Sequence, residues 1–411
     1  MNAAVAGSVV LVLAVGLAGC GAPQGPPSAA GGPSPTPPAT ASPSSVTSAS
    51  PSPPRPLIAI LLPAPDHGAI VEWVSAKGQV VAHETFATPK LSAWTNAGFV
   101  LQPNARLAAG TIFYVDPYGV IRGLAPDGRV TVITSLQLRP GQNIISFAPS
   151  PNGRQVAASI LNYPPVHNPP PNNLTDPFLE PGHWWYDYET AAAGGPAIRV
   201  VSKDLGEFSN CANAAVGVAC LAEPAGVTTV VGWDRDGPVA ITDTQLSAQS
   251  PPPSSRTPGS ALVHLGPDGS HSEQLGGAGC RPLDENSAGQ VICWHPRDDA
   301  GYPGDFVVTT TAGAVVWLAD LRSQGYTSNP LLSPLGDRFC VTGKVYGQAA
   351  PPTTLPSTSP NSRETCVGWL DDTTVLLWSS TGELYSMNLS TGERSPLLTP
   401  FGTVTFLGVA A

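Results

Sequence analysis

A four-residue turn motif recurs between short apolar runs of this chain and limits the folds that it can adopt. Residues 125–128, 150–153 and 266–269 read Ala-Pro-Asp-Gly, Ser-Pro-Asn-Gly and Gly-Pro-Asp-Gly, and residues 333–336 are a degenerate copy. Proline sets φ for such a turn, and Asp or Asn followed by Gly tolerates the left-handed conformation that closes a tight hairpin. The intervening runs are rich in Val, Ile, Thr and aromatic residues and lack long helical periodicity. The pattern predicts an all-β chain.

A longer self-match shows the repeated unit. Residues 231–239 (VGWDRDGPV) align with residues 367–375 (VGWLDDTTV), so that strand, acidic turn and strand recur. These motifs resemble the WD40-like repeats of the TolB type (PD40), in which a Ser-Pro-Asp-Gly turn joins the two inner strands of a propeller blade. The resemblance implies a β-propeller, a ring of four-stranded antiparallel blades that bury their apolar faces against one another. It covers most of residues 57–411 and specifies architecture rather than activity.

The strand pattern favours a seven-bladed ring, with six blades as the alternative if residues 331–342 belong to a distorted neighbouring blade. Residues 57–62, 70–75 and 80–86 form one strand less than a blade, and the chain ends in a lone strand at 403–409. We expect this last strand to lie innermost in the first blade. Pairing the two ends would close the ring and remove an exposed sheet edge.

Long connections are predicted at equivalent positions of several blades. The predicted connections between a second and a third strand are residues 162–196, 244–260, 296–305 and 344–363. Residues 91–101 are assigned to the inner strand of blade two, and residues 198–203 to the third strand of blade three. In a propeller, all connections of this kind leave the ring on one side. Loops longer than about 12 to 15 residues are uncommon unless they bind a ligand or are disordered. We therefore expect this side to be the binding surface.

The first of these connections carries the candidate ligand-binding residues. In order they are His183, Trp184, Trp185, Tyr186, Asp187 and Tyr188, followed by Glu189. Adjacent aromatic rings can stack on a sugar or anchor a protein partner, since they bury large areas with few rotamers to restrict. The alternative is that Trp184 and Trp185 cover the end of the central channel or hold the connection against the blades. A metal site formed by His167, His183 and Asp187 is a weaker hypothesis, because no fixed ligand spacing supports it.

The N-terminal segment, residues 1–20, predicts where the protein works. Its apolar run is shorter than the roughly 20 residues of a membrane-spanning helix, and small residues follow the run. Leu17-Ala18-Gly19-Cys20 resembles the lipobox of bacterial lipoprotein signal peptides. The resemblance implies cleavage before Cys20, a diacylglyceryl group on its thiol, and anchoring to the cell membrane on the extracytoplasmic side. An unlipidated secretory signal and a buried helix with a chance cysteine are the alternatives.

A spacer follows the lipobox. Residues 21–56 are almost entirely Pro, Ser, Ala, Thr and Gly, with Arg55 as the only charged residue. Such a segment has too little apolar surface to offset the entropy of folding, so we expect it to be disordered. At about 3.1 Å per residue in a polyproline II conformation, it could extend on the order of 100 Å. The propeller is assigned to residues 57–411.

Six cysteines follow Cys20, an even number that suits disulfide bonds outside the cytoplasm. Several complete pairings are possible, and the simplest joins sequence neighbours: Cys211 with Cys220, Cys280 with Cys293, and Cys340 with Cys366. The second bond would join the two inner strands of blade five, and the third would clamp the connection at 344–363. No pair shows the two-residue spacing of a zinc site or a thioredoxin-like centre, so we expect neither a metal nor a redox cofactor.

Enzyme motifs are scarce. The sequence has no Gly-x-Ser-x-Gly elbow, phosphate-binding glycine loop or His-Glu-x-x-His motif. Carboxylate pairs at 284–285, 298–299 and 371–372 could serve glycoside hydrolysis but are interpreted as turn residues. The net charge of −10 argues against binding to nucleic acid.

The sequence therefore predicts a non-catalytic, lipid-anchored propeller, monomeric and without a cofactor, that binds a protein or a cell-envelope glycan through its long-loop side. The alternative is a secreted propeller enzyme acting on carbohydrate. One geometric feature distinguishes the two: an enzyme needs two carboxylates roughly 5 to 10 Å apart in a pocket. A binding protein needs an exposed aromatic patch without them.

Overall fold

The computed structural model describes most of the predicted propeller. Described are residues 56–410, apart from 65–67, 89–103, 164–165, 168–177, 180–182, 208–226, 243–260, 273, 278–279, 287, 296–304, 320–329, 342, 349, 356–363, 380–381 and 399–403. The predicted signal segment with Cys20, and the linker up to Arg55, lie outside the described residues. Those described all belong to one compact unit, Pro53–Ala411. Among them, no helix is long and apolar enough to cross a membrane.

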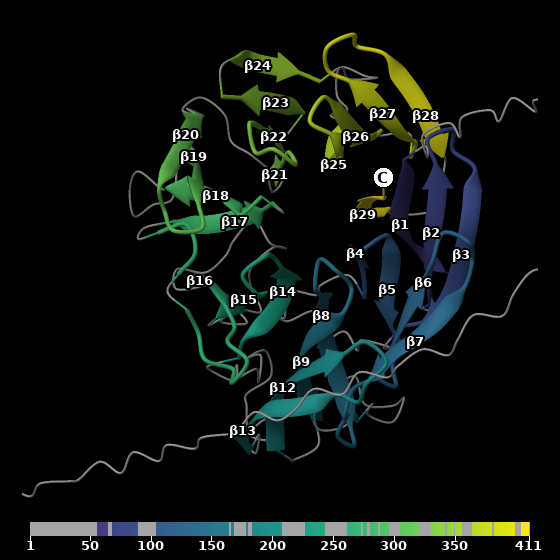
Figure 1. Cartoon of the computed structure of the whole chain (residues 1–411), viewed down its shortest axis with the longest axis vertical. Helices are drawn as coiled ribbons and strands as arrows, with labels where there is room; N and C mark the ends of the chain where they lie inside the picture. The colour runs from purple at the N-terminus through teal and green to yellow at the C-terminus, as the bar shows by residue number, and fades with distance from the viewer. Residues whose placement is uncertain are drawn as a thin grey trace, which may run out of the picture. The chain divides into compact units, whose positions relative to one another are not determined.

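The described strands form seven antiparallel blades that follow one another around a ring (Figure 1). From the centre outward, blade one contains β29 (Thr405–Ala410), β1 (Leu57–Ala64), β2 (Gly68–Ser75) and β3 (Val80–Ala87). Blade two contains β4 (Ala105–Ala108), β5 (Thr111–Val115), β6 (Val120–Leu124) and β7 (Val130–Ser135). Blade three contains β8 (Gln142–Pro149), β9 (Gln155–Tyr163), β12 (His183–Ala192) and β13 (Ile198–Glu207). Blade four contains β14 (Thr229–Trp233), β15 (Pro238–Thr242) and β16 (Ala261–His264).

The remaining blades come from the C-terminal part of the chain. Blade five contains β17 (Arg281–Glu285), β18 (Gln290–His295), β19 (Asp305–Thr310) and β20 (Val315–Ala319). Blade six contains β21 (Leu331–Leu332), β22 (Arg338–Val341), β23 (Lys344–Gly347) and β24 (Ala350–Thr354). Blade seven contains β25 (Thr365–Asp371), β26 (Thr374–Trp378), β27 (Leu384–Asn388) and β28 (Arg394–Leu398). A two-stranded ribbon, β10 (Val166–His167) with β11 (Phe178–Leu179), lies between β9 and β12 in the chain. The prediction of an all-β, seven-bladed propeller is confirmed.

The two ends of the described chain pair in blade one. β29 runs antiparallel to β1, with Ile58 opposite Val409 and Ile60 opposite Phe406, and a bulge separates the two registers. β29 is the innermost strand of this blade, as Figure 1 shows beside β1. The expected closure of the ring by the C-terminal strand is confirmed.

The turn motifs fold as their residues require. Gly128, Gly153, Gly269 and Gly336 all have φ between 68° and 83°, a region that side chains rarely adopt. The amide of Gly153 donates to Ser150 O (2.8 Å) and that of Gly336 to Ser333 O (2.9 Å). These two turns join the two inner strands of blades three and six. The other two follow the third strands of blades two and four, so the motif marks two kinds of turn.

Packing between blades forms the core. In the described residues, every pair of neighbouring blades shares one buried apolar cluster. Between blades five and six, Phe339 packs edge-on against Phe306 and stacks on Trp317 and Tyr346. Most strands are therefore covered on both faces, which explains their continuous apolar runs.

Three strand assignments from the sequence were wrong. The inner strand of blade two is β4, whereas residues 91–101 lie outside the described part. The third strand of blade three is β12, so residues 198–203 belong to the fourth strand, β13. Lys344–Thr354 forms β23 and β24, which complete blade six. Asp and Glu in β12, and Pro in β24, are disfavoured in strands, and this misled the sequence interpretation.

A glycine beside the closing strand provides a test of ring closure. A Cβ at Gly368 would lie 2.0 Å from Phe406 Cδ1 on β29, whereas one at Gly232, the equivalent position of blade four, would meet nothing nearer than 4.0 Å. We expect Gly368→Ala to lower the free energy of unfolding by about 1 to 3 kcal/mol through overpacking. Gly232→Ala should cost less than about 1 kcal/mol. Urea unfolding followed by tryptophan fluorescence measures both, and equal losses would contradict the packing.

Candidate functional site

The predicted ligand-binding residues lie on a strand and not in a loop. His183–Ala192 is β12, paired with β9 on one side and β13 on the other. Alternate side chains of a strand point to opposite faces. Tyr186 and Tyr188 join the apolar cluster shared with blade four, and Trp184 packs against that cluster. Asp187 and Glu189 therefore lie on the face toward blade two. The expectation of a loop at these residues was wrong.

Asp187 and Glu189 are buried carboxylates that pair with arginines. Arg139 Nε lies 2.9 Å and Arg199 Nε 3.4 Å from Asp187 Oδ2, while Arg199 Nε is also 3.2 Å from Glu189 Oε1. The backbone amide of Gln137 donates to Glu189 Oε2 at 2.8 Å. Two guanidinium groups thus compensate two charges that would otherwise be costly to bury. This network joins β12 to the segment that follows β7 and to β13.

The remaining residues of the motif have structural partners as well. The Arg139 guanidinium carbon lies 4.1 Å from the ring centroid of Trp185, a cation–π contact. His183 is exposed, and its Nδ1 lies 2.9 Å from Asp204 Oδ2 on β13. His167 belongs to β10, whose side chains are outside the described part. Since Asp187 is held by arginines, the proposed metal site with His167 and His183 gains no support.

A cavity of about 170 Å³ lies between blades three and four. Its lining comprises Tyr186 and Tyr188 of β12, Val201 and Lys203 of β13, and Thr228, Leu265, Gly269 and His271 of blade four. Thr228 Oγ1 and His271 Nε2 are 3.2 Å apart. The cavity thus contains two of the residues singled out in the sequence. The others come from distant segments without a motif of their own.

The irregular outer edge of blade four forms one wall of the cavity. β16 is followed by an isolated bridge between Leu265 and His271 instead of a regular fourth strand. The amides of Ser272 and Leu275 still donate to the carbonyl groups of β16, at 3.0 and 2.7 Å. Gly269 sits directly against β13, because a Cβ there would lie 2.3 Å from Val201 Cγ2.

The charges around the cavity suit recognition of a polar group. Burial raises the pKa of Tyr186 to about 12, although hydrogen bonds with Ser159 and Thr228 act in the opposite direction. Burial, followed by the charge of Tyr186, raises the pKa of Tyr188 to about 12. Both phenols are therefore neutral donors at physiological pH. Lys203 adds an exposed ammonium group, and none of the lining residues is a carboxylate.

A separate group of ionisable residues lies between blades four and five. His264 Nε2 is 2.7 Å from Asp234 Oδ2, and the amides of Asp236 and Gly237 donate to Asp234 Oδ1. One ligand atom each of Asp234, Asp236 and His264 falls within 4.8 Å of the others, as a metal site would require. Both oxygens of Asp234 are already engaged in hydrogen bonds. The arrangement is therefore explained as a turn cap that joins β14 to β16.

Glu285 lies beside this group. Burial, followed by a hydrogen bond and charge repulsion from Asp234, raises the pKa of Glu285 to about 9. Desolvation also acts to raise the pKa of Asp234, but hydrogen bonds from His264 and Glu285 outweigh it and lower that pKa. The two carboxyl groups are thus in direct contact, with the proton on Glu285.

Other acidic residues named from the sequence stabilise turns and strand junctions. Asp284 Oδ2 accepts a hydrogen bond from the amide of Leu332 in blade six (2.8 Å). Asp371 Oδ1 accepts from the amide of Thr373 (2.7 Å), within its own turn. Residues 298–299 lie outside the described part. For the pair at 371–372, the interpretation as turn residues is confirmed.

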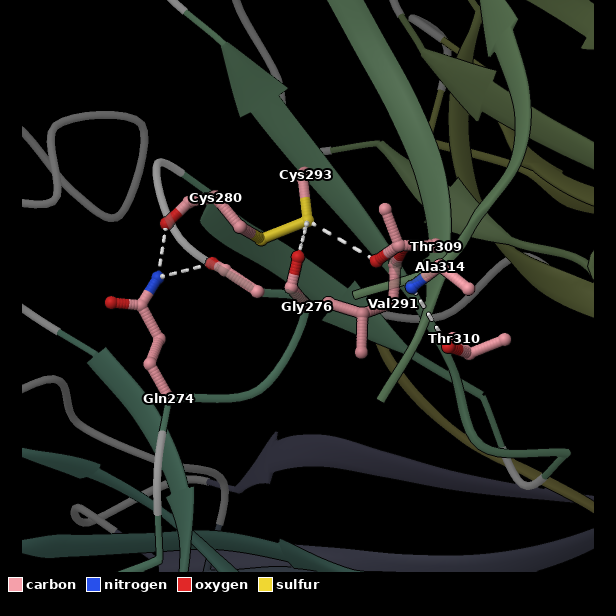
Figure 2. Close-up of a disulfide and its surroundings, with 9 residues drawn as sticks. Gln274, Gly276, Cys280, Val291, Cys293, Thr309, Thr310 and Ala314 are labelled. Carbon is pink, nitrogen blue, oxygen red and sulfur yellow. Dashed lines mark hydrogen bonds between the residues drawn. A yellow bond between two sulfur atoms is a disulfide. The ribbon is translucent and has the colours of Figure 1, made fainter. Parts of the chain in front are cut away.

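The structure tests two of the three predicted disulfides. Cys280 and Cys293 are bonded, with Cα atoms 5.0 Å apart, next to Gly276 and Thr309 (Figure 2). Cys293 Sγ lies 3.8 Å from Gly276 O and 3.5 Å from Thr309 Oγ1. Cys340 and Cys366 are free thiols here, so their predicted bond is absent. Cys211 and Cys220 lie outside the described residues.

Comparison with known proteins finds only distant structural likenesses. No protein family model matches this sequence, and no curated protein matches it. Solved structures that resemble it include the Dos1 propeller, at 9% identity over 85% of this chain and 86% of that chain with a TM-score of 0.44. BamB from Moraxella catarrhalis is 13% identical over 72% of each chain, with a TM-score of 0.35.

The dihydro-heme d1 dehydrogenase NirN in complex with DHE is also similar, at 13% identity over 85% of this chain and 75% of that chain, with a TM-score of 0.37. At these TM-scores the likenesses say nothing of what this chain binds. The seven-bladed fold is established by its own strand pairing, and the TolB-type resemblance of the repeats stays a prediction.

The arginine network of β12 predicts a large stability cost for losing Asp187. Asp187→Asn leaves Arg139 and Arg199 without the buried carboxylate that they share, so we expect a loss of about 3 kcal/mol of unfolding free energy. Asp127→Asn is the control, because Asp127 is exposed and 3.8 Å from Arg129; it should cost less than about 0.5 kcal/mol. Chemical denaturation of both variants measures the difference. An unchanged free energy of unfolding in Asp187→Asn would show that the network does not stabilise the fold.

Glu285 predicts a pH-dependent stability. Its folded-state pKa of about 9 lies above the ordinary value of a glutamate, so folding favours the protonated form. The contribution is complete below about pH 4 and is lost as the pH rises toward 9. We expect the stability of the wild type relative to Glu285→Gln to fall steadily between pH 5 and pH 9. Glu393→Gln, at an exposed residue, should show no such trend in urea titrations across this range.

Proposed function

We propose that this chain is a lipid-anchored, extracytoplasmic propeller that binds a protein or cell-envelope ligand without catalysis. The sequence Leu17-Ala18-Gly19-Cys20 and the Pro/Ser-rich spacer support the anchor. A propeller at the end of an extended spacer could reach partners held in or near the cell wall. The binding role is supported by the cavity between blades three and four.

The composition of the cavity wall carries this proposal. Two neutral tyrosines and Lys203 line it, with no carboxylate among the lining residues. Aromatic walls with a few polar donors are typical of recognition sites. At about 170 Å³ the cavity is smaller than the pockets that enclose whole cofactors or drug-sized ligands, which begin at roughly 300 Å³. It therefore suits one protruding group of a larger partner.

One wall residue of the cavity lies at the start of a blade. The link from β13 to β14 leads directly into Thr228, which lines the cavity. Connections between second and third strands, and between one blade and the next, leave an antiparallel propeller on the same side. A larger partner that inserts a group beside Thr228 would also contact the ring around the cavity. Its larger contact area would supply most of the affinity.

The carbohydrate-hydrolase alternative finds less support. Asp234 and Glu285 have carboxyl groups whose pKa values are shifted in opposite directions, a pattern also seen in acid–base pairs. Hydrolysis of a glycosidic bond requires two carboxyl groups roughly 5 to 10 Å apart, with the sugar between them. Here the two groups share a hydrogen bond. Their pKa shifts are explained by burial and by the contact between blades four and five.

Affinity capture from native membranes tests the binding site. We expect Lys203→Glu in the tagged full-length protein to reduce recovery of cross-linked partners by about 10-fold, because the substitution reverses the charge at the cavity. Arg129→Glu is the matched control, an equally simple charge reversal at an exposed residue of blade two. Equal recovery with both variants would remove the cavity from the proposal.

The anchor is tested in the same preparation. Cys20→Ser should move the protein from the membrane pellet to the soluble fraction and abolish labelling by radioactive fatty acid. Lys203→Glu should leave both unchanged. Retention of Cys20→Ser in the membrane fraction, without label in the wild type, would contradict lipid anchoring while leaving the binding result intact.

A further inference from the structure

Two thiols from neighbouring blades meet in one buried cluster. Cys340 lies in β22 of blade six and is fully buried, and Cys366 lies in β25 of blade seven and is half-buried. Both belong to the apolar cluster between these blades, which also contains Trp369 and Leu377. Cys366 Sγ itself lies 3.8 Å from Gly368 O, on the same strand as Trp369. β22 and β25 come together only through the ring, since they belong to different sheets.

Neighbouring contacts fix the two strands at this place. Trp369 Nε1 donates to Leu331 O at 2.9 Å, which links β25 to β21. Leu331 is the strand partner of Cys340. β21, which pairs with β22 beside Cys340, is therefore bonded to β25, the strand that carries Cys366. A bond between the two sulfur atoms would therefore link strands that already contact each other through Trp369 and Leu331.

This pair has a different setting from the one expected. Lys344–Gly347 and Ala350–Thr354 are strands of blade six, so a bond between Cys340 and Cys366 would not clamp a loop. It would join two blades that are otherwise held by side-chain packing and single hydrogen bonds. Cys280 and Cys293 differ, because Cys280 directly precedes β17 and Cys293 lies in β18, the neighbouring strand of the same blade.

We propose that Cys340 and Cys366 are a modification site, a dithiol that oxidation converts to an inter-blade disulfide joining blades six and seven. The oxidant is a disulfide, either of a thiol–disulfide oxidoreductase or of a small thiol compound. Its supply in the cell rests on the extracytoplasmic location proposed above, whereas the reaction itself does not.

The reaction proceeds by two exchange steps. Cys366, the more accessible residue, loses its proton and attacks one sulfur of the oxidant, forming a mixed disulfide and releasing one thiolate. Cys340 then loses its proton and attacks Cys366 Sγ, which forms the Cys340–Cys366 bond and releases the second thiolate. The two released thiolates take up the two protons. The protein loses two electrons, and the oxidant disulfide is reduced to two thiols.

Burial sets the order of these steps. It raises the pKa of the Cys340 thiol well above its usual range, and the hydrogen bond and charge of Cys366 raise it further. Only the thiolate is nucleophilic, so Cys340 reacts poorly with an external oxidant. It acts as the resolving thiol once Cys366 carries the mixed disulfide beside it.

Oxidised glutathione is the probe for this site. We expect the full-length wild type, after incubation with it, to yield a non-reduced peptide that joins Cys340 to Cys366 in mass spectrometry after proteolysis. Both residues should then resist alkylation in denaturant. The melting temperature should rise on the order of 5 °C relative to the reduced pair, because the cross-link restricts the unfolded chain.

Two variants complete the experiment. In Cys366→Ser, Cys340 should stay alkylatable and glutathione should not raise the melting temperature, whereas the Cys280–Cys293 peptide should be unchanged. Cys340→Ser should stop at a glutathione adduct on Cys366. Alkylation of both residues in the treated wild type, a stable glutathione adduct there, or pairing with Cys211 or Cys220 would each overturn the inference. None of these outcomes depends on ligand capture, so the proposed binding function is tested independently.

Discussion

Pairing between β29 and β1 is the constraint on which the rest of the ring depends. The C-terminal strand completes blade one by pairing with β1, where Ile58 lies opposite Val409 and Ile60 opposite Phe406. No blade of the ring is then left without a neighbour. Every blade can then bury both of its faces. The apolar clusters between blades follow from that closure, because an open array would leave two of these faces in water.

Burial on both faces also explains where the sequence interpretation failed. β12 alternates tyrosines with carboxylates, and the carboxylates look like loop residues in a chain whose other strands are apolar. Asp187 and Glu189 can lie inside only because two arginines reach them. Arg139 comes from the segment before blade three, and Arg199 comes from β13. Arg139 is 48 residues from Asp187 in sequence, so no local pattern connects it to β12. Turn chemistry and strand periodicity therefore predicted the ring and its closure, but not this strand.

The candidate site shows a similar division. The sequence predicted Tyr186 and Tyr188 as binding residues because aromatic residues cluster there. It placed them in a loop, whereas they lie on a strand. Lys203, Thr228 and His271 carry no motif, and only the packing of blade four against blade three brings them together. Treating His183–Ala192 as a third strand would have placed the two tyrosines on one face. It would also have directed attention to the neighbouring blade as the other wall of a site.

The cysteines show how far sequence proximity predicts a bond. Cys280 and Cys293 flank a hairpin, so neighbours in the sequence are neighbours in one sheet and their pairing was predictable. Cys340 and Cys366 approach across two sheets, where the ring geometry decides their distance. A closed ring has one seam of strand pairing, and elsewhere its blades are held mainly by side-chain packing. A covalent link between blades six and seven would strengthen one such interface, and blade seven directly precedes the closing strand β29 in the chain.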